Sequence, residues 1–140
     1  MPTTAVREPG DAYRCVARHF NGMERESFVV VVLDVKNRPR HVATVAQGSV
    51  DICLVDPREV FAVAIRERGT AVLVAHNHPS GDPEPSGEDL LLTERLAEGG
   101  VILGIPVLDH IIVGRKTAQN NGYVSLAERG LMPGAPGQAA

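Results

Sequence analysis

The sequence has no tryptophan and few aromatic residues, which make up 4% of its 140 residues. Aliphatic side chains must therefore build most of any core. Apolar runs of membrane-spanning length are also absent, which excludes a transmembrane helix. The only two cysteines, Cys15 and Cys53, lie far apart and form no CxxC pair. We expect two reduced, buried thiols and no cysteine-based zinc site.

A basic excess is missing as well. The formal net charge is -3 with histidine neutral, whereas proteins that grip nucleic acid through its phosphates usually carry an excess of lysine and arginine. The first ten residues contain no basic start followed by an apolar segment, so they do not match a signal peptide. These features predict a soluble, cytoplasmic protein with no membrane partner.

The chain has the length of one domain, and a domain of this size buries a core without disulfides or structural metals. Residues 1–10 are polar and contain two prolines, which favours a flexible leader. Residues 132–140 are rich in proline, glycine and alanine, which is typical of a disordered tail. We therefore expect one domain at residues 11–131.

Apolar periodicity and turn residues predict a mixed sheet flanked by helices. Residues 28–35 are apolar and mostly β-branched, as in a strand buried on both faces. Asp11 and Asp56 are expected to begin helices, and Gly99-Gly100 to end one. The expected elements are a helix at 11–20, strands at 28–35, 41–46 and 50–55, a helix at 57–68, a strand at 70–75, a helix at 86–98, and strands at 107–113 and 123–126.

A candidate metal site follows the strand expected at 70–75. His76 and His78 are two residues apart, so on an extended chain their side chains point to the same face. A loop rich in proline and glycine then leads to Asp89 in the first turn of the next helix. Two histidines and one carboxylate, with the fourth position left to water, are typical of a catalytic zinc site. Such a site lowers the pKa of the bound water and generates a nucleophile.

Other interpretations of the same residues remain open. Ser86 and Asp89 match a helix capping box, in which they would bond each other's backbone N–H groups. Ser86 could cap the helix and still face the metal. Asp82 and Glu84 have carboxylates suited to a metal, but their position between prolines favours solvated side chains.

The spacing of these residues resembles the JAMM (JAB/MPN) metalloprotease superfamily, whose signature is His-x-His, seven residues, Ser, two residues and Asp. His76, His78, Ser86 and Asp89 fit it without a gap. The segments HNHPSGDPEPSGEDLLLTERL, GIPVLDHIIVG and GYVSLAERGLM look like the RadC branch of that superfamily. The resemblance extends roughly over residues 20–131.

This resemblance implies a cytidine-deaminase-like three-layer α/β fold and a metallohydrolase with one zinc per chain, held by His76, His78 and Asp89. It also implies a glutamate just before the first strand as general acid and base. Glu26 matches that position, although Glu24 has the same strand parity. The pattern Glu26-x-Phe28 favours Glu26.

The implied reaction is hydrolysis of an amide or isopeptide bond in a peptide or protein substrate. Glu26 would move the proton, and Ser86 would donate a hydrogen bond to the oxyanion. Two alternatives are a DNA-repair accessory protein of the RadC type and a peptide-binding pseudoenzyme. RadC-branch members usually carry a helix-hairpin-helix-like region ahead of this domain, whereas only about twenty residues precede it here, so we expect the catalytic domain alone.

Asp109 and His110 lie in a segment that resembles the family, but neither receives a catalytic role. A buried, hydrogen-bonded Asp/His pair is the preferred interpretation. The alternative is that His110 contacts a metal ligand from behind.

Overall fold

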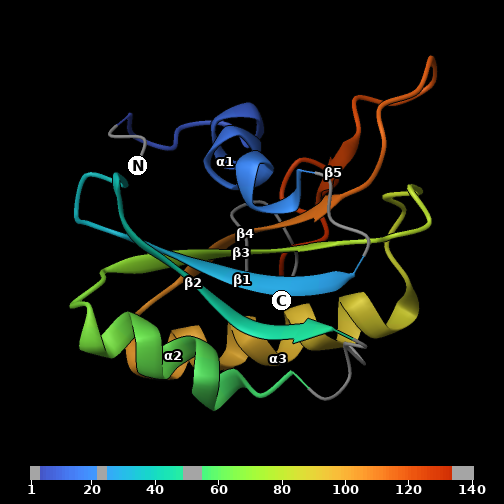
Figure 1. The fold of residues 1–140 in the computed structure, drawn as a ribbon. Coiled ribbons are helices and arrows are strands. Elements are labelled where there is room, and N and C mark those ends of the chain that lie inside the picture. The colour runs from blue at the N-terminus through green and yellow to red at the C-terminus, as the bar shows by residue number, and fades with distance from the viewer. Residues whose placement is uncertain (1–3, 22–24, 49–54, 134–140) are drawn as a thin grey trace.

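A five-stranded sheet forms the centre of the computed structural model, which describes residues 4–21, 25–48 and 55–133 (Figure 1). The strands are β1 (Glu26–Leu33), β2 (Pro39–Gly48), β3 (Ala71–Asn77), β4 (Val107–Val113) and β5 (Tyr123–Ser125). The helices are α1 (Pro9–Val16), the 3₁₀ helix η1 (Ala17–Phe20), α2 (Pro57–Arg66) and α3 (Gly87–Leu103). In the sheet the strand order is β2-β1-β3-β4-β5. Strands β3 and β4 are parallel, and the other neighbours are antiparallel.

Helices cover both faces of the sheet, α1 and η1 on one side and α2 and α3 on the other (Figure 1). The alternation of side chains along β1 explains the two cores. Phe28 and every second residue after it pack into the core that contains α2 and α3 residues, whereas Val29 and its alternates pack against α1. The fold is therefore a three-layer α/β/α arrangement, as expected, and β1 is buried on both faces.

Most expected elements are present, with corrections at their ends. Helix α1 begins at Pro9, so Asp11 lies inside its first turn and is not its N-cap. The Asp11 carboxylate instead accepts the backbone N–H groups of Arg7 and Glu8. The strand expected at 41–46 is longer than expected, because Gln47 and Gly48, which fall between two of the expected strands, belong to β2. The strand expected at 50–55 lies outside the described residues except for Val55.

Helix α3 is longer than expected. It does not end at Gly99-Gly100 but continues to Leu103 and is followed by Gly104 in the left-handed conformation. Close packing explains both internal glycines. A Cβ at Gly99 would lie 2.9 Å from the Phe61 ring, and one at Gly100 would lie 2.6 Å from the Ile105 carbonyl oxygen. These glycines let α2 and the chain after α3 approach the helix.

The cysteines, the start of the expected tail and the length of the helices can also be compared with expectation. Cys15 is buried, as expected, whereas Cys53 lies outside the described residues. Met132, which we placed in the tail, is buried beside Val124 and Leu126. Within the described ranges, no helix is both long and apolar enough to cross a bilayer.

Candidate metal centre

Strand β3 and the start of α3 bring the sequence-predicted ligands together. The strand is longer than expected and includes His76, whose side chain lies on the α3 side of the sheet and is fully buried. His78 follows the strand end and is 19% exposed at its side chain. The loop after β3 then leads into α3 (Figure 1), where Asp89 in the first turn is buried.

The ligand atoms converge on one point. His76 Nε2 lies 3.1 Å from Asp89 Oδ1, and His78 Nε2 lies 3.1 Å from Asp89 Oδ2. The two Nε2 atoms are themselves 3.1 Å apart. Atoms that bind a tetrahedral zinc at about 2.0–2.1 Å are separated from one another by about 3.3–3.4 Å. The three residues therefore have the donor types and nearly the spacing of a zinc site.

Glu26 reaches the same site from β1. It is the first residue of that strand, and Phe28 two residues later pairs with His76 across the sheet. One carboxylate oxygen of Glu26 and one nitrogen of each histidine all lie within 4.8 Å of one another. Glu24, the alternative acid and base, lies outside the described residues.

Hydrogen bonding fixes how His78 faces the site. Its Nδ1 lies 2.8 Å from the backbone carbonyl oxygen of Asp82. A carbonyl oxygen only accepts, so Nδ1 carries the proton and Nε2 of the neutral ring presents a lone pair. The Asp89 carboxylate, 3.1 Å from that Nε2, accepts a hydrogen bond only from the protonated ring. It therefore raises the pKa of His78 above its ordinary value, against the effect of partial burial.

His76 is held by a chain of buried side chains. The Thr93 hydroxyl donates to the Asp89 carbonyl oxygen at 2.8 Å, so it accepts from His110 Nδ1 at 2.6 Å. Burial lowers the pKa of His110 well below its ordinary value, which keeps the ring neutral. Its unprotonated Nε2 accepts from His76 Nδ1 at 2.8 Å. His76 Nε2 therefore also presents a lone pair to the site.

Sequence reasoning missed Thr93 and preferred another role for His110. Asp109 and His110 are both buried, as expected, but their side chains do not pair. The Asp109 carboxylate accepts the backbone N–H of His110 and the Ser125 hydroxyl. The His110 ring instead contacts His76, which is the alternative we left open. One sequence feature could have indicated this contact: His110 lies on β4, the strand that pairs in parallel with β3.

Asp89 is held as a carboxylate despite its burial. Burial raises its pKa, but the His76 and His78 rings donate hydrogen bonds to it when their Nε2 atoms are protonated. That effect outweighs burial and leaves the pKa of Asp89 far below its ordinary value. Ser86 N–H donates to Asp89 Oδ2 at 2.8 Å, and Asp89 N–H donates to Ser86 Oγ at 3.1 Å. The capping box is therefore present. Ser86 Oγ is the acceptor in this contact, so the proton of the Ser86 hydroxyl is not used in it. Ser86 is also exposed.

The two other loop carboxylates lie outside the ligand cluster. Asp82 is exposed, and its Oδ1 accepts the backbone N–H of Glu84. Glu84 is exposed as well, but it forms a two-bond ion pair with Arg129 at 2.6 and 2.7 Å. Solvated side chains were expected at both positions, and the arginine partner of Glu84 was not.

Comparison with known families gives this arrangement its context. The family model described as RadC-like JAB domain matches residues 6–131. The chain belongs to the RadC-like JAB domain family. This confirms the resemblance seen in the motif around His76.

Relatives of this RadC-like JAB domain include several proteins named UPF0758. A UPF0758 protein of Syntrophotalea carbinolica is 47% identical over 131 residues, which cover 89% of this chain and 56% of that protein. A UPF0758 protein of Desulfitobacterium hafniense is 45% identical, covering 91% of this chain and 54% of its own length. A UPF0758 protein of Methanosarcina mazei is 41% identical, and the match covers 94% of this chain and 55% of that protein. The RadC-like JAB domain thus spans about half the length of these curated relatives.

Proposed function

We propose that this RadC-like JAB domain is a zinc-dependent hydrolase that cleaves an amide bond in a peptide or protein. The observation that supports it most strongly is the convergence of His76 Nε2, His78 Nε2 and the Asp89 carboxylate at 3.1 Å contacts. These three residues would hold one zinc per chain. Three protein ligands leave a coordination position for water and substrate, as in catalytic zinc sites.

Bound zinc would supply Lewis acidity, which lowers the pKa of a water molecule in the site towards neutrality. Glu26 is the group suited to move that proton. Its carboxylate lies near both histidines at the edge of the site. It accepts the proton from the attacking water and delivers it to the leaving amine, which an amide needs in order to depart.

Ser86 is the residue suited to stabilise the developing oxyanion. It is the exposed N-cap residue of α3, and both its backbone N–H and its Oγ are hydrogen-bonded to Asp89. Its hydroxyl proton is not used in that contact and is therefore available for donation to a substrate oxygen. A donor of this kind contributes about 10²–10³ in rate.

Access to the site is one-sided, which fits a substrate that approaches from solvent. The His76 and Asp89 side chains are 0% and 2% exposed, whereas that of His78 is 19% exposed. Burial of the former strengthens their interaction with a cation because water does not screen it. A substrate would therefore approach from the side of His78 and Ser86, which are the more exposed residues of the site.

The test is hydrolysis of a fluorogenic peptide library by the purified chain, with zinc content measured in parallel. Wild-type protein should bind about one zinc, and a chelator should abolish hydrolysis until zinc is restored. Asp89→Asn should lose most of its zinc and its activity. Asp82→Asn changes an exposed carboxylate of the same loop and should retain both. Hydrolysis that survives complete zinc removal, or full zinc content in Asp89→Asn, would contradict the proposal.

A further inference from the structure

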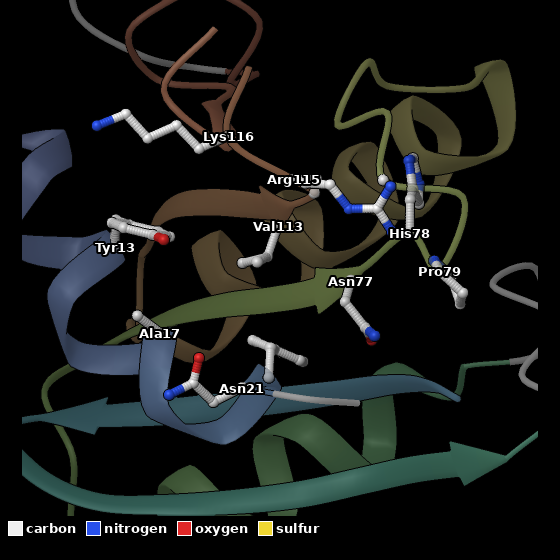
Figure 2. Close-up of a pocket in the computed structure, with 12 residues that line it drawn as sticks. Tyr13, Ala17, Asn21, Asn77, His78, Pro79, Val113, Arg115 and Lys116 are labelled. Atoms are coloured by element: carbon white, nitrogen blue, oxygen red, sulfur yellow. The ribbon is translucent and has the colours of Figure 1, made fainter. Parts of the chain in front are cut away.

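A pocket opens beside His78 on the face of the sheet that α1 covers (Figure 2), whereas the His76 side chain lies on the other face, towards α3. Its volume is about 350 Å³, near the lower end of the range of about 300–1,000 Å³ for ligand pockets. The lining comes from α1, η1, the end of β3 and the residues that follow β4. His78 lines it too, so the pocket adjoins the candidate metal centre.

The charge of this pocket is opposite to that of the chain. Arg115 and Lys116 line it, and no aspartate or glutamate is among its described lining residues. The whole chain has a formal net charge of -3. Tyr13, Asn21 and Asn77 add neutral polar groups to the lining. A positive, partly enclosed surface on an acidic protein favours a negatively charged ligand.

Arg115 is the better placed of the two cations. In Figure 2 its guanidinium points towards His78, whereas the Lys116 side chain points away from it. The Arg115 backbone N–H donates to the Gly81 carbonyl oxygen at 2.6 Å, which ties it to the loop that follows His78. Gly81 makes room for the arginine, because a Cβ there would lie 3.2 Å from Arg115 Cβ and 3.4 Å from its guanidinium carbon.

The guanidinium of Arg115 is also available to a ligand. The residue is exposed, and within the described part of the chain no carboxylate forms an ion pair with it. Arg58, Arg66 and Arg129, by contrast, each pair with an acidic side chain. A planar guanidinium forms two parallel hydrogen bonds with a carboxylate, a geometry that lysine does not provide.

We propose that this pocket binds a carboxylate of the substrate, held by Arg115, while the neighbouring amide lies at the metal centre beside His78. The substrate class is then a peptide whose scissile amide is close to a free C-terminus or an acidic side chain. This inference rests on the proposed function, because it identifies the ligand as part of the hydrolysed molecule. A phosphate group has related oxyanion chemistry, and the experiment separates the two.

The test is an NMR titration of the ¹⁵N-labelled 140-residue chain with N-acetyl-dialanine, followed at the backbone signals of Asn77, Gly114 and Lys116. The free carboxylate should shift these signals in a saturable and salt-sensitive manner, because charge pairing drives binding. The C-terminal amide of the same peptide should bind at least tenfold more weakly. Arg115→Gln should weaken carboxylate binding by about tenfold to a hundredfold. Arg95→Gln, an exposed arginine of α3, should leave binding unchanged.

Several results would overturn this inference. Equal binding of the carboxylate and the amide, or wild-type affinity in Arg115→Gln, would remove the assigned role of Arg115. Inorganic phosphate that shifts the same signals at a lower concentration than the peptide would make the pocket a phosphate site. The readout requires no hydrolysis. Lost peptide binding with intact zinc-dependent hydrolysis therefore refutes only the pocket assignment. Carboxylate binding at Arg115 without hydrolysis refutes the proposed function and leaves the pocket as a carboxylate site that is not a substrate site.

Discussion

At the scale of single residues, His76 and His78 face the same point because two different partners hold their Nδ1 atoms. A backbone carbonyl oxygen, that of Asp82, accepts from His78, and the His110 ring accepts from His76. Either partner leaves Nε2 as the lone-pair atom. This arrangement orients both rings before any cation binds, which reduces the ordering that binding requires.

The same scale gives a prediction that separates Glu26 from the ligands. Glu26→Gln keeps the shape of the side chain and removes its basicity. Amide hydrolysis should fall by about 10²–10⁴, the usual contribution of general acid-base catalysis, while zinc content stays near the wild-type value. Steady-state kinetics and elemental analysis on the same preparation measure both quantities.

Two further variants complete that test. Asp89→Asn weakens metal binding, so excess zinc should partly restore its activity, whereas excess zinc should not restore Glu26→Gln. Glu24→Gln is the control and should behave like wild type. An inactive Glu24→Gln enzyme beside an active Glu26→Gln enzyme would reverse the assignment. Loss of zinc from Glu26→Gln would make Glu26 a ligand.

Residue spacing was enough to predict that His76, His78 and Asp89 cluster, but not which residues hold them in place. His76 lies on β3 and His78 directly after its end, two residues further along an extended chain, so their side chains point the same way. The capping position places Asp89 in the first turn of α3. Thr93 and His110 join them only because α3 packs on the sheet and β4 lies beside β3. Contacts of that kind depend on tertiary packing, which periodicity does not specify.

At the scale of elements, α3 shows how packing overrides a local helix-ending signal. Two successive glycines normally weaken a helix by about 0.5–1 kcal/mol each. Here Gly99 faces the Phe61 ring and Gly100 faces the Ile105 backbone. The helix continues through both glycines because a side chain at either position would clash with these neighbours. It ends at Gly104, whose φ is 69°.

Gly100→Ala tests this explanation. A Cβ only 2.6 Å from a backbone carbonyl oxygen cannot be accommodated by a side-chain rotation. The substitution should lower the free energy of unfolding by about 1–3 kcal/mol, despite the higher helix propensity of alanine. Urea denaturation measures the change.

Gly87→Ala is the matched control within the same helix. A Cβ at Gly87 would meet no atom within 4 Å. Its free energy of unfolding should remain at the wild-type value or rise slightly. If Gly100→Ala were as stable as Gly87→Ala, close packing would not be the reason for the glycine.

At the scale of the whole molecule, the strand order creates the site. β1 lies antiparallel beside β3, which places Glu26 near the histidines although fifty residues separate Glu26 from His76. The element sequence predicted a mixed sheet flanked by helices, and the family resemblance implied three layers. The order β2-β1-β3-β4-β5 did not follow from the pattern of elements. Alternation within each strand fixes which face a side chain takes, and only sheet pairing fixes its neighbours.

The measurement that most directly tests the metal centre is the anomalous scattering of a crystal of this chain grown with zinc, recorded at the zinc absorption edge. We predict one peak per chain, about 2.0–2.2 Å from His76 Nε2, His78 Nε2 and an Asp89 carboxylate oxygen, with Glu26 outside direct coordination. A crystal with no peak at these three residues, or a peak bound directly by Glu26 as a fourth protein ligand, would contradict the account.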